Sequence, residues 1–122
     1  MSNNNRIYII ELQYFEIRMQ DHIFWKKRAT FISLMENFIH NLITFEDFET
    51  KFSILWWESM KESDTIKFDL EKFKNRELSS ESKNYCSYMT AIFRQFEEID
   101  DEISTIEESK NFVKDIYDKL VN

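Results

Sequence analysis

The chain has 122 residues, enough for one domain with a sizeable core, and 43% of them are hydrophobic and 16% aromatic. It contains neither Gly nor Pro, so it lacks the residues that phosphate-binding loops, dinucleotide-binding turns, nucleophile elbows and tight hairpins need. The 16 basic and 23 acidic side chains give a net charge of −7, which disfavours direct binding to nucleic acid or to an anionic membrane.

The N-terminal part of the chain fits no single amphipathic face. Residues 6–27 are apolar on nearly every side, which leaves three interpretations open: an extra helix, a swapped arm or a dimer contact. Residues 1–5 lack the basic and apolar regions of a signal peptide, and no stretch is apolar enough to span a bilayer. We therefore expect a cytoplasmic protein.

Two amphipathic helices are predicted next, joined by a short connection near His40 and Asn41. Thr44 is a candidate N-cap for the second helix, with Asp47 in a capping-box position. Because so few residues join the two helices, they must run antiparallel. Their apolar positions are Phe31, Leu34, Met35, Phe38 and Leu42, followed by Phe45, Phe48, Phe52, Leu55, Trp56 and Met60.

The second half predicts two further helices. One begins at Ser79 or Ser80, and the other begins at Ser104, which forms a capping box with Glu107. Residues 64–76 fit a short helix, which we favour, or a strand. We predict an all-α fold, an antiparallel four-helix bundle with an additional N-terminal helical segment. The apolar stripes of the last two helices are Tyr85, Tyr88, Met89, Ile92, Phe93, Phe96 and Ile99, and then Ile106, Val113, Ile116, Tyr117 and Leu120.

No catalytic or metal site is evident from motifs, so we expect no enzyme and no cofactor. Glu36 and His40 have the i, i+4 spacing of one helix face, but the sequence has no second such pair to complete a di-iron centre. Cys86 adjoins a buried stripe, where packing is its usual role. Ser80 and Lys83 match one hydrolase motif without the motifs that accompany it.

Charge is distributed unevenly along the chain. Residues 1–45 carry a net charge of +1, residues 46–90 carry −3 and residues 91–122 carry −5. Seven acidic side chains lie between Arg94 and Lys110 with no basic residue among them. This stretch is either a solvated turn or a surface complementary to a basic cleft, in which carboxylates replace the phosphates of a nucleic acid.

The order of these features resembles the colicin D immunity protein-like family of bacterial self-protection proteins. The resemblance covers residues 28–122 of a single domain spanning residues 1–122, and residues 1–27 exceed the usual family length. The segments that carry it are Phe38–Ile43, the helix opening Thr44–Glu49 with Trp56 and Trp57, and the acidic turn Glu98–Glu102 followed by Ile103–Glu108.

The resemblance implies a helical bundle that binds a cognate RNA-cleaving toxin domain. Acidic side chains that imitate the tRNA backbone would block the active site of the toxin, and the bundle itself would perform no reaction. Trp57 points about 100° away from Trp56 on a helix, which makes it a candidate anchor for such a contact. The implied partner-binding positions are Glu97, Glu98, Asp100, Asp101 and Glu102, with Glu58 and Glu62 as lesser candidates.

Other functions compete with this one. A helical adaptor or self-associating protein would form a homodimer through its apolar N-terminal segment, and its acidic turn would serve only solubility. An acidic mimic aimed at a different nucleic-acid-binding protein would carry the same charge pattern. Charge alone does not separate these alternatives from a toxin inhibitor.

Overall fold

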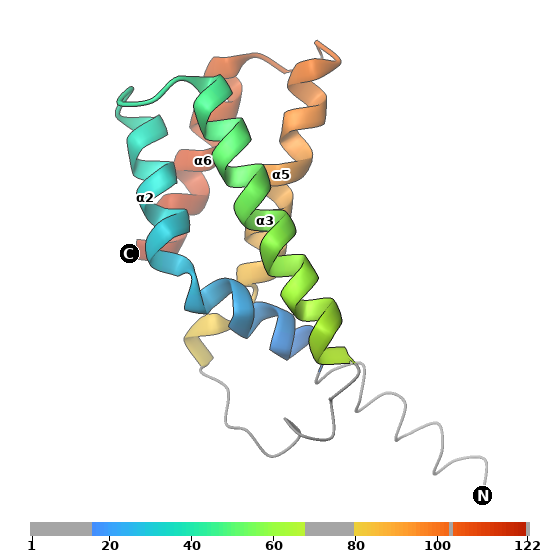
Figure 1. Ribbon diagram of the computed structural model, residues 1–122. Coiled ribbons are helices and arrows are strands. Elements are labelled where there is room, and N and C mark those ends of the chain that lie inside the picture. The colour runs from blue at the N-terminus through green and yellow to red at the C-terminus, as the bar shows by residue number, and fades with distance from the viewer. Residues whose placement is uncertain (1–15, 68–79, 103, 122) are drawn as a thin grey trace, which may run out of the picture.

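The computed structural model describes residues 16–67, 80–102 and 104–121, and this part of the chain contains helices and no strand. Helices α2, α3, α5 and α6 alternate in direction, and each packs against two neighbours so that the four close a ring (Figure 1). The predicted antiparallel four-helix bundle is confirmed. Its elements are α2 (Arg28–Ile39), α3 (Phe45–Lys67), the 3-10 helix η1 (Ser80–Ser82), α5 (Tyr85–Asp100) and α6 (Ile106–Val121), with residues 16–26 helical before α2.

Aromatic rings from the predicted apolar stripes make the centre of the core. Phe48 of α3 is fully buried and stacks on Phe38 of α2, with ring centroids 4.4 Å apart. Phe96 of α5 meets the rings of Phe48 and Phe52 edge to face, at 5.8 Å in both cases. Each pair of this kind adds about 0.5 to 1.5 kcal/mol beyond the area that it buries. The rings therefore tie α5 to the α2–α3 hairpin.

The connection between α2 and α3 ends one helix sharply and caps the next. α2 ends at Ile39, and Asn41 adopts a left-handed conformation with φ 60°. This turn leaves Leu42 outside the helix and 71% exposed, so its predicted place in the core is wrong. Thr44 caps α3 as predicted, because its Oγ1 accepts a hydrogen bond from the Asp47 N–H at 3.1 Å.

The start of α6 lies one residue later than the sequence suggested. Its cap is Thr105, whose Oγ1 accepts the N–H of Glu108 at 3.2 Å and whose hydroxyl donates to the Glu108 carboxylate at 3.3 Å. The predicted pairing of Ser104 with Glu107 is therefore wrong. Ile106, the first residue of α6, is 44% exposed rather than part of the buried stripe.

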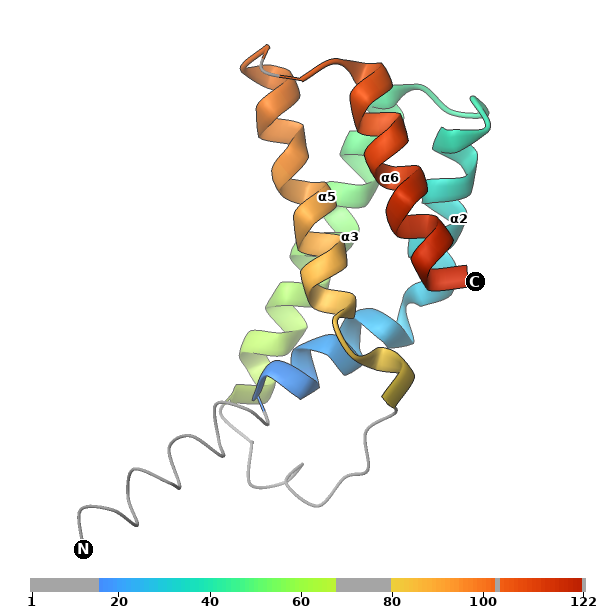
Figure 2. The same ribbon diagram turned by 180° about the vertical axis from the view of Figure 1, so that it is seen from behind.

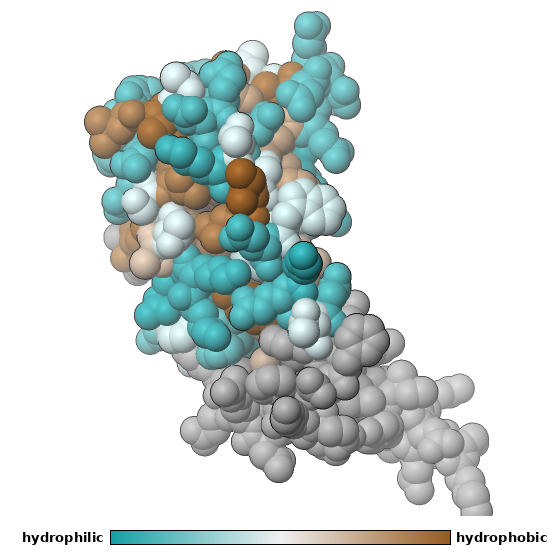
Figure 3. All heavy atoms as spheres, in the orientation of Figure 1, coloured by the Kyte–Doolittle hydropathy of each residue, from teal (hydrophilic) through white to brown (hydrophobic). Residues whose placement is uncertain are grey.

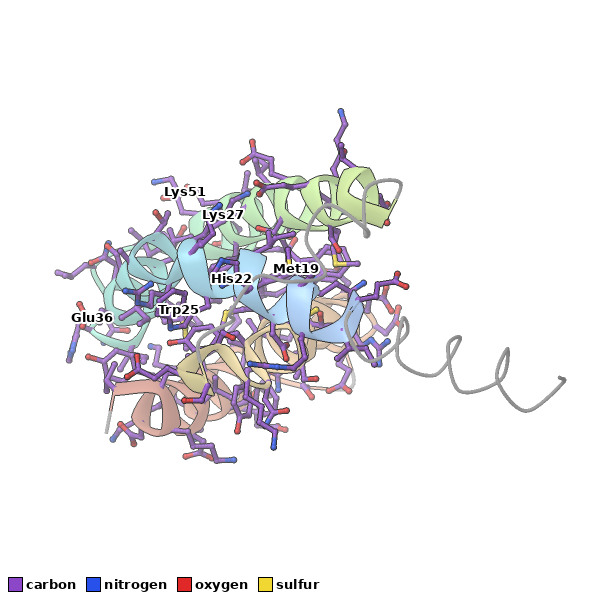
Figure 4. All side chains as sticks on the ribbon, turned by 90° about the horizontal axis from the view of Figure 1, so that it is seen from below. Met19, His22, Trp25, Lys27, Glu36 and Lys51 are labelled. Carbon is purple, nitrogen blue, oxygen red and sulfur yellow. The ribbon has the colours of Figure 1, made fainter. Side chains whose placement is uncertain are left out.

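The helix at residues 16–26 lies across the end of the bundle (Figures 1 and 4). Met19, Ile23 and Phe24 on this helix are buried, with at most 2% of each side chain exposed. Of the three interpretations of the N-terminal segment, an extra helix holds for these residues. Residues 1–15 lie outside the described part of the chain.

The start of α5 was also predicted wrongly. Tyr85 is its first residue, whereas the sequence placed the start at Ser79 or Ser80. Ser80 belongs to η1, and Ser79 lies outside the described residues. A serine cap is not needed, because the first amides of α5 are bound by an aspartate from the N-terminal helix.

That aspartate is Asp21, which is only 4% exposed. Its carboxylate accepts hydrogen bonds from the backbone N–H of Asn84 at 3.1 Å and of Cys86 at 3.0 Å. Arg18 donates to the same carboxylate at 3.2 Å. A buried charge is stable when it is paired and hydrogen-bonded in this way. Asp21 thus joins the N-terminal helix to the start of α5.

Residues 64–67 complete α3, and the rest of the segment 64–76, in which we favoured a short helix, lies outside the described residues. Among the helices that the structure describes, none is both long and apolar enough to cross a membrane.

Candidate protein-binding surface

The predicted acidic residues gather at the C-terminal end of α5. Glu97, Glu98 and Asp100 lie in its last turns, and Asp101 and Glu102 follow directly. All five side chains are exposed, and a hydrophilic projection covers this end of α5 in Figure 3. Within the described ranges none of the five forms an ion pair. Their negative charge is therefore presented to solvent rather than neutralised by a lysine or arginine.

Local hydrogen bonds hold this acidic end in shape. The backbone N–H of Asp101 closes the last turn of α5 by donating to the Glu97 carbonyl at 2.9 Å, and Glu102 turns the chain with φ 62°. The Ser104 hydroxyl donates to the Glu98 carboxylate at 3.2 Å. A hydroxyl fixes a carboxylate without cancelling its charge, so the turn is ordered and still anionic.

Helix α3 brings two further carboxylates to this end of the bundle. Glu46 and Glu49 lie in its first turns, and α3 runs antiparallel to α5, so these turns adjoin the end of α5 (Figure 1). Burial raises the pKa of Glu49, and the nearby charges of Asp100 and Glu46 raise it further. Sequence analysis missed both residues because they are far from the acidic turn along the chain. The antiparallel order of the helices, together with the acidic residues at the start of α3, could have indicated that these residues lie near the acidic turn.

A hollow of about 460 Å³ lies below the acidic end, between α3 and α5. The Trp56 ring stacks on Phe93 with centroids 4.0 Å apart, and its Nε1 donates to the Thr90 hydroxyl at 3.0 Å. Acidic side chains outnumber the single arginine of the lining, which makes the hollow anionic with an aromatic wall. Its lining is Trp56, Thr90, Phe93, Arg94, Glu97, Glu98 and Asp101.

Trp57 stands beside this hollow and is 60% exposed. Its ring meets Trp56 edge to face at 5.0 Å and Phe93 at 6.0 Å. The two adjacent tryptophans therefore have different surroundings, as their helical spacing predicts: Trp56 packs against the core and Trp57 faces solvent. A large ring held rigidly at the surface is the kind of side chain that anchors protein interfaces.

The two lesser candidates on α3 are not part of this surface. Glu58 is exposed and lines a separate apolar hollow together with Leu34 of α2, on the side of α3 away from α5. Glu62 lies farther along α3 and forms an ion pair with Lys27 at 3.2 Å. The structure therefore brings together Glu97, Glu98, Asp100, Asp101 and Glu102, and it leaves Glu58 and Glu62 elsewhere.

Among the residues weighed as metal or nucleophile candidates, Glu36 and Cys86 have structural roles. Glu36 accepts a hydrogen bond from the Tyr117 hydroxyl at 2.6 Å, which links α2 to α6 and raises the pKa of Tyr117. His40 is exposed at the C-terminal end of α2. Burial raises the pKa of the Cys86 thiol, which disfavours the reactive thiolate. In the described ranges no three or more His, Cys, Asp or Glu side chains are grouped to hold a metal ion.

Together these features define an all-α bundle that presents carboxylates at one end and an exposed tryptophan beside the hollow below that end. Comparison of the chain with protein-family models, curated proteins and solved structures finds no match.

Proposed function

We propose that this protein is an immunity protein. It binds a cognate nuclease toxin domain and fills the basic active site of that domain with the carboxylates at the end of α5. Each carboxylate takes the position of a phosphate of the RNA substrate, so the inhibitor competes with the substrate without reacting. The proposal rests on the surface described above and on the resemblance carried by the sequence.

The observation that carries the proposal is where these charges lie on α5. The C-terminal end of a helix bears a partial negative charge, which favours cations and disfavours carboxylates by about 0.3 to 1 kcal/mol each. The last turn of α5 nevertheless has no basic residue and ends in Glu97, Glu98 and Asp100. A merely solvated surface has no need of acidic residues at this position. Binding to a basic partner accounts for their placement, because the helix end adds to the negative potential that the partner meets.

Trp57 supplies an aromatic anchor, which exposed charges cannot supply. Exposed charges steer association and set the register of a complex, whereas affinity depends on a few desolvated side chains near its centre. The Trp57 ring adjoins the anionic hollow, so an arginine or lysine of the toxin that enters the hollow meets both carboxylates and aromatic faces.

Charge reversal at the acidic turn tests the proposal. In the variant Asp100→Lys/Asp101→Lys, we expect association with the cognate nuclease toxin domain to slow by at least tenfold, measured by stopped-flow fluorescence. Protection of cells that express the toxin should fall in parallel. The fold should remain, because both side chains are exposed.

The matched control is Asp115→Lys/Asp118→Lys, which makes the same change of charge on exposed positions of α6. We expect this control to bind at nearly the rate of the unchanged protein. Equal association rates for the two double variants would mean that only net charge matters, and would overturn the assignment of the surface.

Trp57→Ala should act mainly on dissociation from the toxin domain, with complexes dissociating at least tenfold faster.

A further inference from the structure

A second hollow, of about 390 Å³, lies toward the other end of the bundle, near the start of α2, the start of α5 and the end of α6. Figure 2 shows the C-terminal end of α6 on the same side as η1 and the start of α2. Three cationic side chains from these separate elements line the hollow: Arg28, Lys83 and Lys119. Glu81 is the one carboxylate among the described residues of its lining.

These cations have no carboxylate partner in the described part of the chain. Arg28 is held in place by Trp25, with its guanidinium carbon 3.8 Å from the ring centroid and its Nη1 donating to the Trp25 carbonyl at 3.0 Å. Lys119 lies over the Tyr88 ring at 6.0 Å. In a protein with 23 acidic and 16 basic residues, three unpaired cations around one hollow are unexpected.

The positions of the three cations in the helices differ. Arg28 closely follows the helix at residues 16–26 and donates to the Trp25 carbonyl of its last turn, and Lys119 lies in the last turn of α6, so a helix end favours both cations. Lys83 directly precedes the N-cap of α5, at the positive end of that helix. Helix ends do not explain why side chains of three separate elements gather around one hollow, whereas binding of an anion does.

The other walls of the hollow suit an organic anion. Trp25 and Tyr88 offer aromatic faces. Tyr85 is 5% exposed, and burial raises the pKa of its hydroxyl, which therefore stays protonated at neutral pH and can donate a hydrogen bond. Volumes between about 300 and 1,000 Å³ are typical of small-molecule sites.

We propose that this hollow binds a small molecule that carries a phosphate monoester. The three cations and Glu81 give the described residues of the lining a net charge of +2, which matches the phosphate dianion rather than the carboxylate monoanion. The guanidinium of Arg28 suits the oxygens of a phosphate, and the lysines add charge. This site is independent of the surface proposed to bind a toxin.

The test is a titration of the full chain followed by backbone amide NMR shifts at constant ionic strength and pH 7.5. Phenyl phosphate, inorganic phosphate and acetate are the probes. We expect saturable shifts around Arg28, Tyr85 and Lys119 with phenyl phosphate, and at least tenfold weaker binding of acetate. Binding of phenyl phosphate tighter than that of inorganic phosphate identifies an organic monoester as the ligand class, whereas equal binding of the two overturns that class and leaves a free-phosphate site.

The variant Lys83→Gln/Lys119→Gln should weaken phenyl phosphate binding at least tenfold. Both lysines are exposed, so the fold should tolerate the change. Lys114→Gln, on an exposed position of α6, is the control and should bind as the unchanged protein does. Shifts that rise linearly, that are the same with acetate, or that persist in the double variant would show only general screening and would overturn the site.

Discussion

Glu49 lies half-buried in α3, and one oxygen of its carboxylate is buried without a hydrogen-bond partner among the described residues. Burial, Asp100 and Glu46 all raise its pKa. The folded state therefore binds a proton at Glu49 at a higher pH than the unfolded chain does. The ionised side chain opposes folding at neutral pH, and this opposition is relieved as the pH falls through the folded pKa toward the ordinary value.

Glu49→Gln should therefore stabilise the protein at pH 7, by about 0.5 kcal/mol because the site is only partly buried. The gain relative to the unchanged protein should shrink as the pH falls through the folded pKa of Glu49 and disappear below about pH 4. Urea unfolding of both proteins across this pH range measures the gain in stability.

Glu58→Gln is the control for this measurement. Glu58 is exposed farther along α3, away from the acidic end of the bundle. We expect its replacement to change the free energy of unfolding at pH 7 by less than about 0.5 kcal/mol. If Glu49→Gln stabilised the protein no more than this control does, crowding of carboxylates at this end of the bundle would carry no cost.

At the scale of the element, α5 depends on a residue far from it in sequence. Asn84 occupies the N-cap position, but its side chain makes no capping hydrogen bond, and its backbone is in the left-handed conformation with φ 70°. Asp21 provides the cap through its bonds to the N–H groups of Asn84 and Cys86. This cap fixes where α5 starts.

Asp21→Ala should lower the free energy of unfolding by about 2 to 4 kcal/mol, because it removes the acceptor of two partly buried N–H groups and one of the partners of Arg18. Asp115→Ala, at an exposed position of α6, should cost less than about 0.5 kcal/mol. Guanidinium unfolding followed by circular dichroism measures both variants. Similar losses in the two would mean that the cap contributes nothing to stability.

At the scale of the whole molecule, the N-terminal helix is part of the fold. Met19, Ile23 and Phe24 are each at most 2% exposed, and each contributes about 1.5 to 3 kcal/mol of burial. Their sum is comparable with the total stability of an ordinary domain. A bundle made of residues 28–122 alone therefore loses Phe24 from its hydrophobic core, together with the burial of Met19 and Ile23.

Deletion of residues 1–27 should abolish cooperative thermal unfolding, measured by circular dichroism. A shortened chain that unfolds cooperatively near the temperature of the full chain would contradict this view of the core. The substitution pair Ile23→Ala and Ile17→Ala repeats the test without deletion. Ile23→Ala should lower the free energy of unfolding by about 2 to 5 kcal/mol, because Ile23 is buried. Ile17→Ala should lower it far less, because Ile17 is 57% exposed.

Self-association is therefore better tested on the full chain. The proposed function requires a surface free to meet a toxin, so we expect light scattering to give a monomer over a hundredfold range of concentration. A dimer that forms in this range would favour the competing interpretation, a self-associating adaptor.

Helical periodicity determined most of the architecture. The apolar stripes through Phe48 and Phe96 predicted which faces are buried, and the spacing of Trp56 and Trp57 predicted that one of them is exposed. These inferences succeed because a helix fixes the direction of each side chain from its position alone. The acidic turn was also readable, since its residues are neighbours along the chain.

Only the tertiary structure decided what depends on contacts between distant segments. Asp21 caps α5 across 65 residues of sequence to Cys86, so no local pattern marked the start of that helix. Glu49 joins Asp100 because α3 and α5 are antiparallel neighbours, and Arg28 shares a hollow with Lys119 because α2 packs on α6. Sequence spacing determines the face of a helix, whereas packing determines which faces meet.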